Sequence, residues 1–212
     1  MLTNAYACLD FFRVDENDTF LSFLPLSHTF ERTVGYYLTV MAGATVAFAR
    51  SIPLLSEDLQ TIRPTLLISV PRIYERIYGA VRAKLEEGSP LKRKLFNLTV
   101  ETGWDRFLCQ QGRGSWKMSF LLWPLLQKLV AQKVLDRLGG RLRVALSGGA
   151  ALSPDVSRVF IGLGLSVIQG YGLTETSPVI SGNYPENNFP DSVGQPIRDV
   201  QVKLGEQNAL LV

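Results

Sequence analysis

The sequence predicts an α/β domain, in which βαβ units form a parallel sheet with flanking helices and a helical insert. Short apolar runs alternate with helix-length stretches at close spacing, as in parallel strands joined by crossover helices. The apolar runs are continuous rather than alternating, as in strands that are buried on both faces. With 46% hydrophobic and 19% charged residues, the composition excludes an intrinsically disordered chain. The length of 212 residues fits one large domain or a piece of a larger protein.

Two strands and one helix are expected in the first fifty residues. Residues 20–26 are almost entirely apolar and run into Pro25, which predicts a buried strand that leads into a loop. Residues 31–42 fit a helix that ends at Gly43. Residues 44–49 are apolar and rich in β-forming side chains, so a second buried strand is expected there.

The same alternation continues along the chain. Ser56 is the expected N-cap of the next helix, because acidic residues follow it in the first turn. Pro71 opens a helix over residues 72–85, and Ser153 with Pro154 caps a further helix. The remaining strands are expected at residues 66–70, 143–146 and 165–169.

Residues 80–142 differ in charge from the rest of the chain and predict a basic helical insert. Between residues 80 and 143 there are 13 Lys and Arg against 5 Asp and Glu, whereas the remainder holds 9 basic and 14 acidic residues. All three tryptophans lie here, and residues 118–137 suit an apolar helix interrupted by Pro124. A solvated helical surface and a peripheral membrane contact both explain this composition.

Several classes of protein are not expected. The first residues lack the basic region and apolar core of a signal peptide, and the longest uncharged run, residues 33–49, is too short and glycine-interrupted to span a bilayer. Cys8 and Cys109 lack the spacing of a disulfide scaffold or a metal site, so a reducing, cytoplasmic location is expected. The net charge of +3 is low and no nucleic-acid-binding motif is present, so no nucleic-acid partner is expected.

Two loops after predicted strands carry the residues best suited to ligand binding, since ligands of open parallel sheets collect beyond the carboxyl ends of the strands. The loop at residues 147–152 is glycine-rich, which suits either a closely bound ligand or a sharp turn. The loop at residues 169–178 offers the ring of Tyr171 to a planar ligand, the hydroxyl of Thr174 to a phosphate, and the carboxylate of Glu175 to Mg²⁺. The chain has no Walker A motif and no dinucleotide-binding glycine motif.

The second loop carries a specific resemblance. Residues 171–178 read YGLTETSP, which resembles the signature of the adenylate-forming, or AMP-binding, enzymes. Residues 24–32, LPLSHTFER, and residues 70–77, VPRIYERI, resemble motifs of the long-chain fatty acid–CoA ligases in that superfamily. The glycine-rich loop and the basic insert fit the same branch. The resemblance implies a ligase that uses ATP and Mg²⁺ to convert a fatty acid to acyl-AMP and then transfers the acyl group to CoA.

The resemblance also implies roles for individual residues. Tyr171 would stack on adenine, Thr174 would contact the α-phosphate, and Glu175 would bind Mg²⁺. His28 matches a position near the acyl-adenylate and the thioester tunnel. The implied catalytic residues are Thr174, Glu175 and His28, and the implied nucleotide-binding residues are Gly149, Ala150, Gly170, Tyr171, Gly172 and Thr174.

By the same resemblance, residues 1–212 would be a central part of the family's large N-terminal domain, with the insert at about residues 80–142. The family's phosphate loop and its small C-terminal domain with the catalytic lysine would lie outside the chain, so we expect the chain alone to be inactive. Two alternatives stay open: a ligase for another carboxylic acid, and a non-catalytic nucleotide-binding module. The apolar face of the insert could also line an acyl channel, and open sheet edges would favour self-association.

Overall fold

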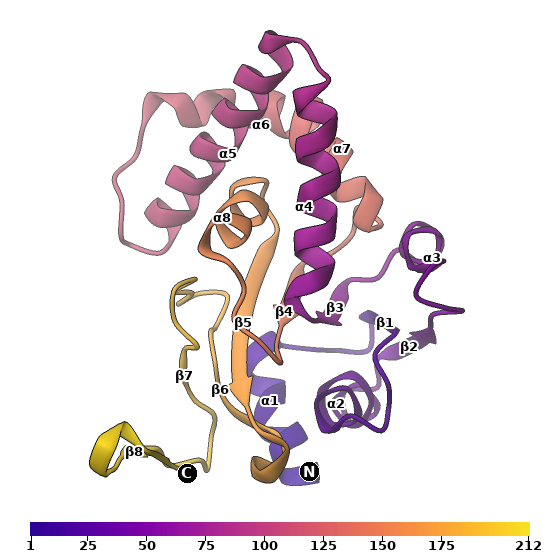
Figure 1. Cartoon of the computed structure of the whole chain (residues 1–212), viewed down its shortest axis with the longest axis vertical. Coiled ribbons are helices and arrows are strands. Elements are labelled where there is room, and N and C mark those ends of the chain that lie inside the picture. Colours follow the sequence, from indigo (N-terminus) through magenta and orange to yellow (C-terminus); the bar gives the residue numbers. More distant parts are fainter.

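The computed structural model describes the backbone of all 212 residues and every side chain except those of Phe12 and Asn208. Seven strands form one sheet in the order β2-β1-β3-β4-β5-β6-β7 (Figure 1). The first five strands in this order are parallel, and β6 and β7 are antiparallel, so the predicted α/β class is confirmed. The strands are β1 (Thr19–Ser22), β2 (Thr45–Phe48), β3 (Leu66–Ser69), β4 (Val144–Ser147), β5 (Ser166–Gly172), β6 (Val179–Gly182) and β7 (Gln195–Pro196), with a separate hairpin of β8 (Lys203–Leu204) and β9 (Leu210–Leu211).

One face of the sheet is covered by the helices of the first forty residues. These are α1 (Leu2–Phe12), the π-helix η1 (Glu31–Tyr37) and α2 (Leu38–Met41). Their apolar side chains form a core with strand residues such as Phe20 and Leu146, both of which are buried. The predicted helix at residues 31–42 is therefore confirmed, although its first half is π-helical.

The opposite face is covered by α3 (Leu55–Ile62), α4 (Pro71–Glu86) and α8 (Pro154–Gly162). A second core lies here, in which Leu67 and Ala145 of the strands contact the helices. Successive strand residues thus point into two different cores. This is the physical reason why the strands are continuously apolar in sequence.

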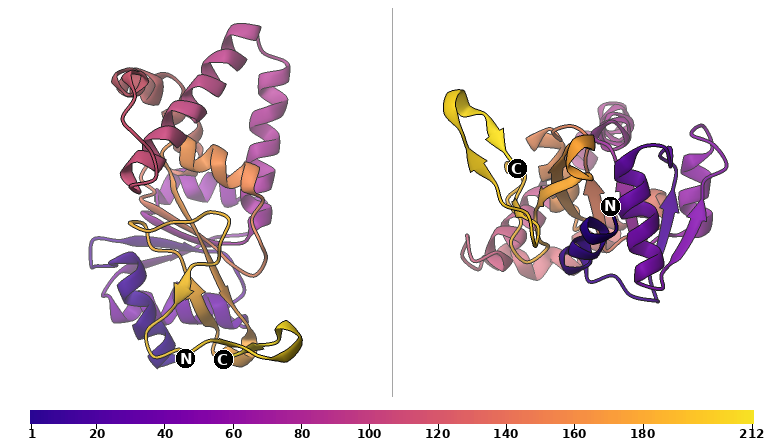
Figure 2. Two further views of the ribbon diagram at one scale, coloured as in Figure 1. Left: turned by 90° about the vertical axis from the view of Figure 1, so that its left-hand side faces the viewer. Right: turned by 90° about the horizontal axis from the view of Figure 1, so that it is seen from below.

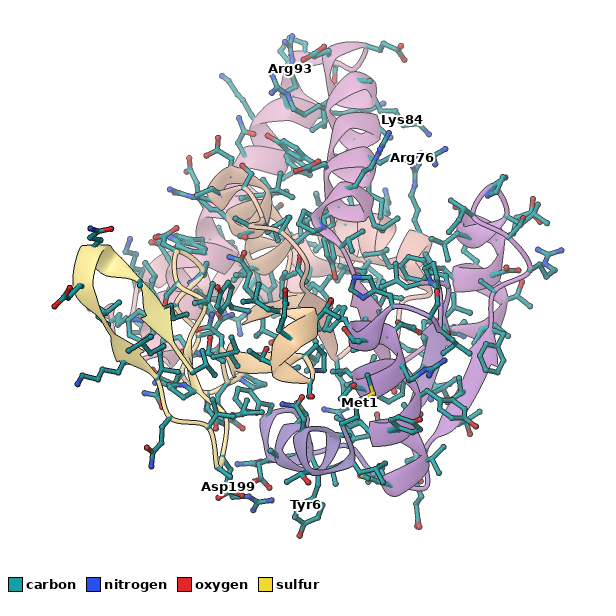
Figure 3. All side chains as sticks on the ribbon, turned by 60° about the horizontal axis from the view of Figure 1, so that its bottom comes forward. Met1, Tyr6, Arg76, Lys84, Arg93 and Asp199 are labelled. Atoms are coloured by element: carbon teal, nitrogen blue, oxygen red, sulfur yellow. The ribbon has the colours of Figure 1, made fainter. Side chains whose placement is uncertain are left out.

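The helical insert projects from the sheet as a hairpin of α4 and α5 (Pro90–Gln110), and α5 packs on α8 (Figure 1). Arg76, Lys84 and Arg93 extend outwards from this hairpin (Figure 3). No described helix is both long and apolar enough to cross a bilayer. The chain returns to the sheet through η2 (Met118–Leu122), α6 (Trp123–Leu126), η3 (Gln127–Ala131), α7 (Gln132–Leu135) and η4 (Asp136–Leu138).

Three sequence predictions need correction. The strand β2 is an edge strand rather than a buried one, and the side chain of Phe48 is 59% exposed, because no strand pairs with its outer side. Ser56 lies inside α3 rather than at its N-cap, which is Leu54. The predicted loop at residues 169–178 begins as strand, since β5 continues to Gly172 by pairing with β6.

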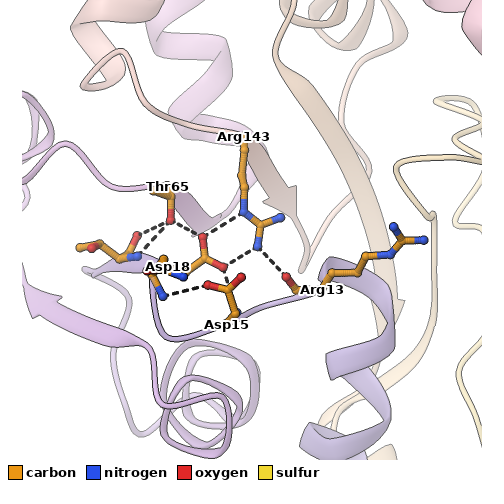
Figure 4. Close-up of polar contacts among 7 residues, drawn as sticks. Arg13, Asp15, Asp18, Thr65 and Arg143 are labelled. Carbon is orange, nitrogen blue, oxygen red and sulfur yellow. Dashed lines mark hydrogen bonds and ion pairs between the residues drawn. The ribbon is translucent and has the colours of Figure 1, made fainter.

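A buried carboxylate joins three strands at the end of the sheet where they begin (Figure 4). Asp18 Oδ1 accepts hydrogen bonds from Thr65 Oγ1 at 2.6 Å and from Arg143 Nε at 2.9 Å. Thr65 Oγ1 in turn accepts a hydrogen bond from the backbone N–H of Thr19 at 3.0 Å. Asp18, Thr65 and Arg143 precede β1, β3 and β4 respectively, so the network fixes these strands relative to one another.

Candidate nucleotide and acyl site

All of the residues singled out from the sequence except Ala150 meet in one pocket at the carboxyl ends of β4 and β5. The cavity has a volume of about 240 Å³. A ligand at this edge of a parallel sheet meets loops rather than regular secondary structure, so its contacts depend on turn residues. The pocket is lined by Cys8, Phe11, His28, Thr29, Phe30, Val34, Leu146, Gly148, Gly149, Gly170, Tyr171, Gly172, Leu173, Thr174, Glu175, Pro178, Val179, Ser181, Gly182 and Asn183.

The loop after β4 forms one wall. Its start is fixed by a hydrogen bond from the backbone N–H of Gly148 to the carbonyl of Ser69 at 3.1 Å. Phe30 packs directly on this loop, and a Cβ atom at Gly148 would lie 2.7 Å from its ring. Gly149 lines the pocket beside Gly148, whereas Ala150 is exposed and is not among the lining residues.

The end of β5 forms the opposite wall. A β-bulge separates Tyr171, which pairs with Ser181, from Gly172, which pairs with Val179. A Cβ atom at Gly172 would lie 1.9 Å from the carbonyl oxygen of Pro178, so only glycine fits this close approach. Tyr171 is half-buried, and its ring lines the pocket.

A short 3₁₀ turn, η5 (Thr174–Thr176), carries Thr174 and Glu175 into the pocket wall. The Thr176 hydroxyl donates to the carbonyl of Pro178 at 2.8 Å, and it accepts a hydrogen bond from the backbone N–H of Leu173 at 3.1 Å. Thr176 therefore holds the turn closed from within. The side chains of Thr174 and Glu175 remain exposed toward a ligand.

His28 approaches the same pocket from the loop after β1. Its Nδ1 accepts a hydrogen bond from the backbone N–H of Phe30 at 3.2 Å. In the neutral imidazole the proton therefore lies on Nε2, which is free to donate to a ligand. The neighbouring hydroxyl of Thr29 is buried, lines the pocket and has no hydrogen-bond partner among the described residues.

Charge in the pocket is sparse. Glu175 is the one carboxylate among the lining residues, and the described lining includes no Lys or Arg. No group of three or more His, Cys, Asp and Glu side chains in the described part of the chain forms a metal cage. One exposed carboxylate fits Mg²⁺, which commonly binds through one or two carboxylates together with substrate phosphates.

The sequence did not predict the part of the pocket wall that comes from α1 and β6. Cys8 and Phe11 come from α1, and Ser181 and Asn183 come from β6 and its continuation. Burial raises the pKa of the Cys8 thiol to about 12, so this thiol stays protonated and is not a nucleophile. The two β-branched residues Val179 and Ile180, which directly follow Pro178, were the signal that could have indicated β6.

Known proteins match both the sequence and the fold of this chain. Long chain acyl-CoA synthetase 6, peroxisomal, of Arabidopsis thaliana is 38% identical over 190 residues, covering 89% of this chain and 26% of the relative. Fatty acyl-CoA synthetase A of Dictyostelium discoideum is 35% identical over 188 residues, covering 88% of this chain and 27% of the relative. The chain thus spans about a quarter of the length of these relatives.

Solved structures agree at the level of the fold. ATP-bound MatB from Rhodopseudomonas palustris superposes with a TM-score of 0.64 and 22% identity, covering 99% of this chain and 32% of that structure. A long-chain-fatty-acid-CoA ligase (FadD1) from Archaeoglobus fulgidus gives a TM-score of 0.59 and 18% identity, covering 99% of this chain and 35% of that structure. The model of the family described as AMP-binding enzyme matches residues 1–210. With its signature turn in the wall of the pocket, the chain belongs to the AMP-binding enzyme family.

Proposed function

We propose that these residues form the adenylate- and acyl-binding part of a long-chain fatty acid–CoA ligase. The observation that carries the proposal is the single pocket that brings Tyr171, Thr174, Glu175 and His28 together. The relatives whose names are long-chain acyl-CoA synthetases support the choice of substrate class. The reaction would join a fatty acid to CoA at the expense of ATP, through an acyl-AMP intermediate.

In the first half-reaction, a carboxylate oxygen of the fatty acid attacks the α-phosphorus of ATP, and pyrophosphate leaves. Tyr171 would stack on the adenine ring, with Gly170 and Gly172 giving the base access to the backbone. The hydroxyl of Thr174 would donate to an α-phosphate oxygen. These contacts hold the two anionic reactants in line, which is what the protein must contribute to such a displacement.

Mg²⁺ would be held by Glu175 together with the substrate phosphates, and it would supply positive charge that reduces the repulsion between the two anions. The fit rests on the exposed Glu175 carboxylate in a pocket whose described lining has no permanent cation.

In the second half-reaction, the CoA thiolate attacks the acyl carbonyl carbon and AMP leaves. His28 would donate a hydrogen bond from Nε2 to the acyl group in both half-reactions. The apolar residues Phe11, Val34 and Leu146 would exclude water from the acyl-adenylate. Exclusion of water matters here because hydrolysis of this intermediate would waste the ATP.

The proposal includes the domain organisation inferred from the resemblance. Residues 1–212 would act as part of an AMP-binding domain, with the insert at about residues 80–142, and would not catalyse adenylation alone. The sparse charge of the pocket supports this, since ATP phosphates need more positive charge than the described lining offers. Pyrophosphate exchange by the purified 212-residue chain would contradict it.

The test of the function uses the full-length polypeptide and measures exchange of labelled pyrophosphate into ATP with acids of graded length. Long-chain acids are expected to support the fastest exchange. Glu175→Ala is expected to reduce exchange about 100-fold or more, as for removal of one transition-state charge contact. Glu87→Ala, which removes an exposed carboxylate from the insert, is the matched control and should retain the wild-type rate.

Two other functions would give different results in this assay. Fastest exchange with an aryl or medium-chain acid would identify a ligase for another carboxylic acid. Binding of ATP without any exchange would identify a non-catalytic nucleotide-binding module. The solved structure of anthranilate CoA ligase AuaEII with anthranoyl-AMP has 18% identity and a TM-score of 0.60, so its similarity concerns the fold.

The remaining parts of the proposal concern location and partners. A cytoplasmic location is proposed, with peripheral contact to a membrane through the basic, tryptophan-containing insert. Self-association is proposed through the open sheet edges at β2 and β7. Light scattering on the full-length protein, before and after a charged substitution at the exposed Phe48, checks the β2 edge.

A further inference from the structure

The outer side of the helical insert carries a strip of large apolar side chains that no described part of the chain covers. We call this strip the insert face. Apart from Trp116, which precedes η2, its members recur at helical spacing along η2, α6 and η3, whereas Trp123 and Leu126 of the same segment are buried. The insert face consists of Trp116 (59% exposed), Met118 (71%), Leu121 (66%), Leu122 (49%), Leu125 (57%) and Leu129 (43%).

The position of the insert face makes it accessible. The segment that carries it runs beside α5 on the side away from α4, at the margin of the molecule (Figure 2), and its side chains are exposed. A contiguous exposed strip of this kind is uncommon on a soluble protein and marks a surface that contacts another molecule. Scattered single exposed side chains elsewhere on the chain need no such explanation.

The charge around the insert face indicates what covers it. Residues 106–135 contain five Lys and Arg and no Asp or Glu, and of these cations Lys117 pairs with Asp105 at 2.6 Å. Lys128 and Lys133 are exposed on the same segment, and neither forms an ion pair with a described side chain. Lysine is depleted at the centre of protein–protein interfaces, whereas lysine beside tryptophan and leucine is typical of helices that lie in the headgroup region of anionic bilayers.

A crevice next to the insert face also combines apolar walls with a positive charge. Its volume is about 320 Å³, and it is lined by aromatic rings that include Trp116, Phe120 and Trp123, with Arg106 as its cation. The Arg106 guanidinium lies 4.7 Å from the centre of the Trp123 ring. Apolar walls with one cation suit the phosphate and upper acyl chain of a phospholipid.

We infer that the insert face docks on the surface of an anionic phospholipid bilayer, with the leucines entering the acyl boundary and Lys128 and Lys133 contacting the headgroups. The proposed function includes contact between the insert and a membrane, and this inference assigns that contact to one surface of the insert. It rests on exposure and charge rather than on the ligase reaction. Vesicle binding is measured without ATP, CoA or fatty acid, so loss of ligase activity and loss of docking are distinguishable.

The first test is co-sedimentation of the full-length protein with vesicles of phosphatidylcholine alone and of phosphatidylcholine with about 30% phosphatidylserine, a content that gives the surface potential of an anionic membrane. Binding is expected to the second composition and to weaken at high salt. The double variant Leu121→Glu/Leu125→Glu is expected to bind the vesicles at least about tenfold more weakly than the wild type. The control, Leu91→Glu/Leu98→Glu, changes two exposed leucines of α5 and should bind like the wild type.

The second test separates a docking surface from general attraction of a basic insert. Lys128→Glu/Lys133→Glu is expected to reduce vesicle binding about tenfold. Lys84→Glu/Lys94→Glu makes the same change in net charge near the tip of the α4–α5 hairpin and should have little effect. Equal loss in the two double variants would overturn the inference, because it would show attraction without a defined face.

The third test asks whether another segment of the full-length chain covers the insert face instead. Tryptophan emission should be quenched by brominated lipids, and Trp116→Phe should remove most of this quenching, since Trp116 is exposed while Trp123 is buried. Quenching that is unchanged in Trp116→Phe would overturn the inference. So would strong hydrogen-exchange protection of residues 116–129 in the lipid-free protein.

Discussion

At the residue scale, Glu31 is unusual because it is a carboxyl group inside the core. It is 1% exposed, and its Oε2 atom has no hydrogen-bond partner among the described residues. Burial raises the pKa of Glu31 to about 7, although a hydrogen bond from Ser22 opposes this. Because the pKa of Glu31 is higher in the folded than in the unfolded state, the free energy of unfolding is greatest at acidic pH and falls as the pH rises through the folded pKa of about 7.

We therefore expect Glu31→Gln to change the pH dependence of stability. The wild-type protein should lose free energy of unfolding between about pH 5 and pH 8, on the order of 2 kcal/mol, and the glutamine variant should lose much less. Urea unfolding at the two pH values measures this. Glu87→Gln, at an exposed position, should keep the wild-type dependence. The same slope in Glu31→Gln as in the wild type would show that Glu31 is not the titrating group.

Substitutions at Tyr171 distinguish the contribution of ring stacking to AMP binding from that of a hydrogen bond by the hydroxyl group. Tyr171→Ala in the full-length protein is expected to weaken AMP binding at least about tenfold, because stacking of a base on an aromatic ring contributes about 1–3 kcal/mol. Tyr171→Phe keeps the ring and should bind nearly as well as the wild type. Calorimetric titration with AMP provides the measurement. Equal weakening in the two variants would assign the contact to the hydroxyl group instead.

At the scale of elements, α5 of the insert crosses α8 at very short range. A Cβ atom at Gly103 of α5 would lie 1.8 Å from the carbonyl oxygen of Gly162 in α8. The two backbones approach this closely only because both positions are glycine. The crossing positions α5, and the segment that carries the insert face packs on α5.

Gly103→Ala is therefore expected to lower the free energy of unfolding by about 1–3 kcal/mol, as for overpacking of a core. Gly79→Ala is the control, since a Cβ atom there would meet nothing within 4 Å and alanine favours the helix by up to about 1 kcal/mol. Urea denaturation followed by circular dichroism compares the two variants. A Gly103→Ala protein as stable as the wild type would show that α5 and α8 can separate at little cost.

The sequence predicted most elements because their apolar runs follow directly from burial on both faces. The run at residues 66–70 and the helix opened by Pro71 are examples. It did not predict β6, whose four residues pair only after the β5 turn reverses the chain. Nor did it predict the π-helical start at Glu31, which depends on tertiary contacts. For the site, the signature motif identified its own turn, but the walls from α1 and β6 require three-dimensional pairing.

At the scale of the whole molecule, Asp18 connects segments that are far apart in sequence. Burial alone would raise the pKa of Asp18, but hydrogen bonds from Arg143 and Thr65 hold it below its usual value. A lowered carboxyl pKa contributes stability that is present at neutral pH and is lost as the pH falls through the folded value. The network lies at the opposite end of the strands from the pocket.

Asp18→Asn is expected to lower the free energy of unfolding at pH 7 by about 1–3 kcal/mol, because the buried hydroxyl of Thr65 and the guanidinium of Arg143 lose a charged acceptor. The loss should be smaller at pH 3, because part of the stability contributed by the ionised carboxylate is lost once the pH falls below the ordinary carboxyl pKa of about 4. Thermal unfolding at the two pH values tests this against Asp199→Asn, an exposed control. AMP binding should be unchanged in both variants. An equal loss at pH 3 and pH 7 would rule out the ionised carboxylate as the source.

The first helix and the sixth strand are joined across nearly the full length of the chain. The Asn4 side chain donates to the carbonyl of Val179 at 2.7 Å and accepts from its N–H at 3.1 Å, and the rings of Phe11 and Tyr184 stack at 4.2 Å. During synthesis on the ribosome, α1 emerges about 170 residues before its partners in and after β6. The pocket can therefore form only after β6 has been synthesised. Until then the apolar side of α1 lacks its partners and is exposed to aggregation.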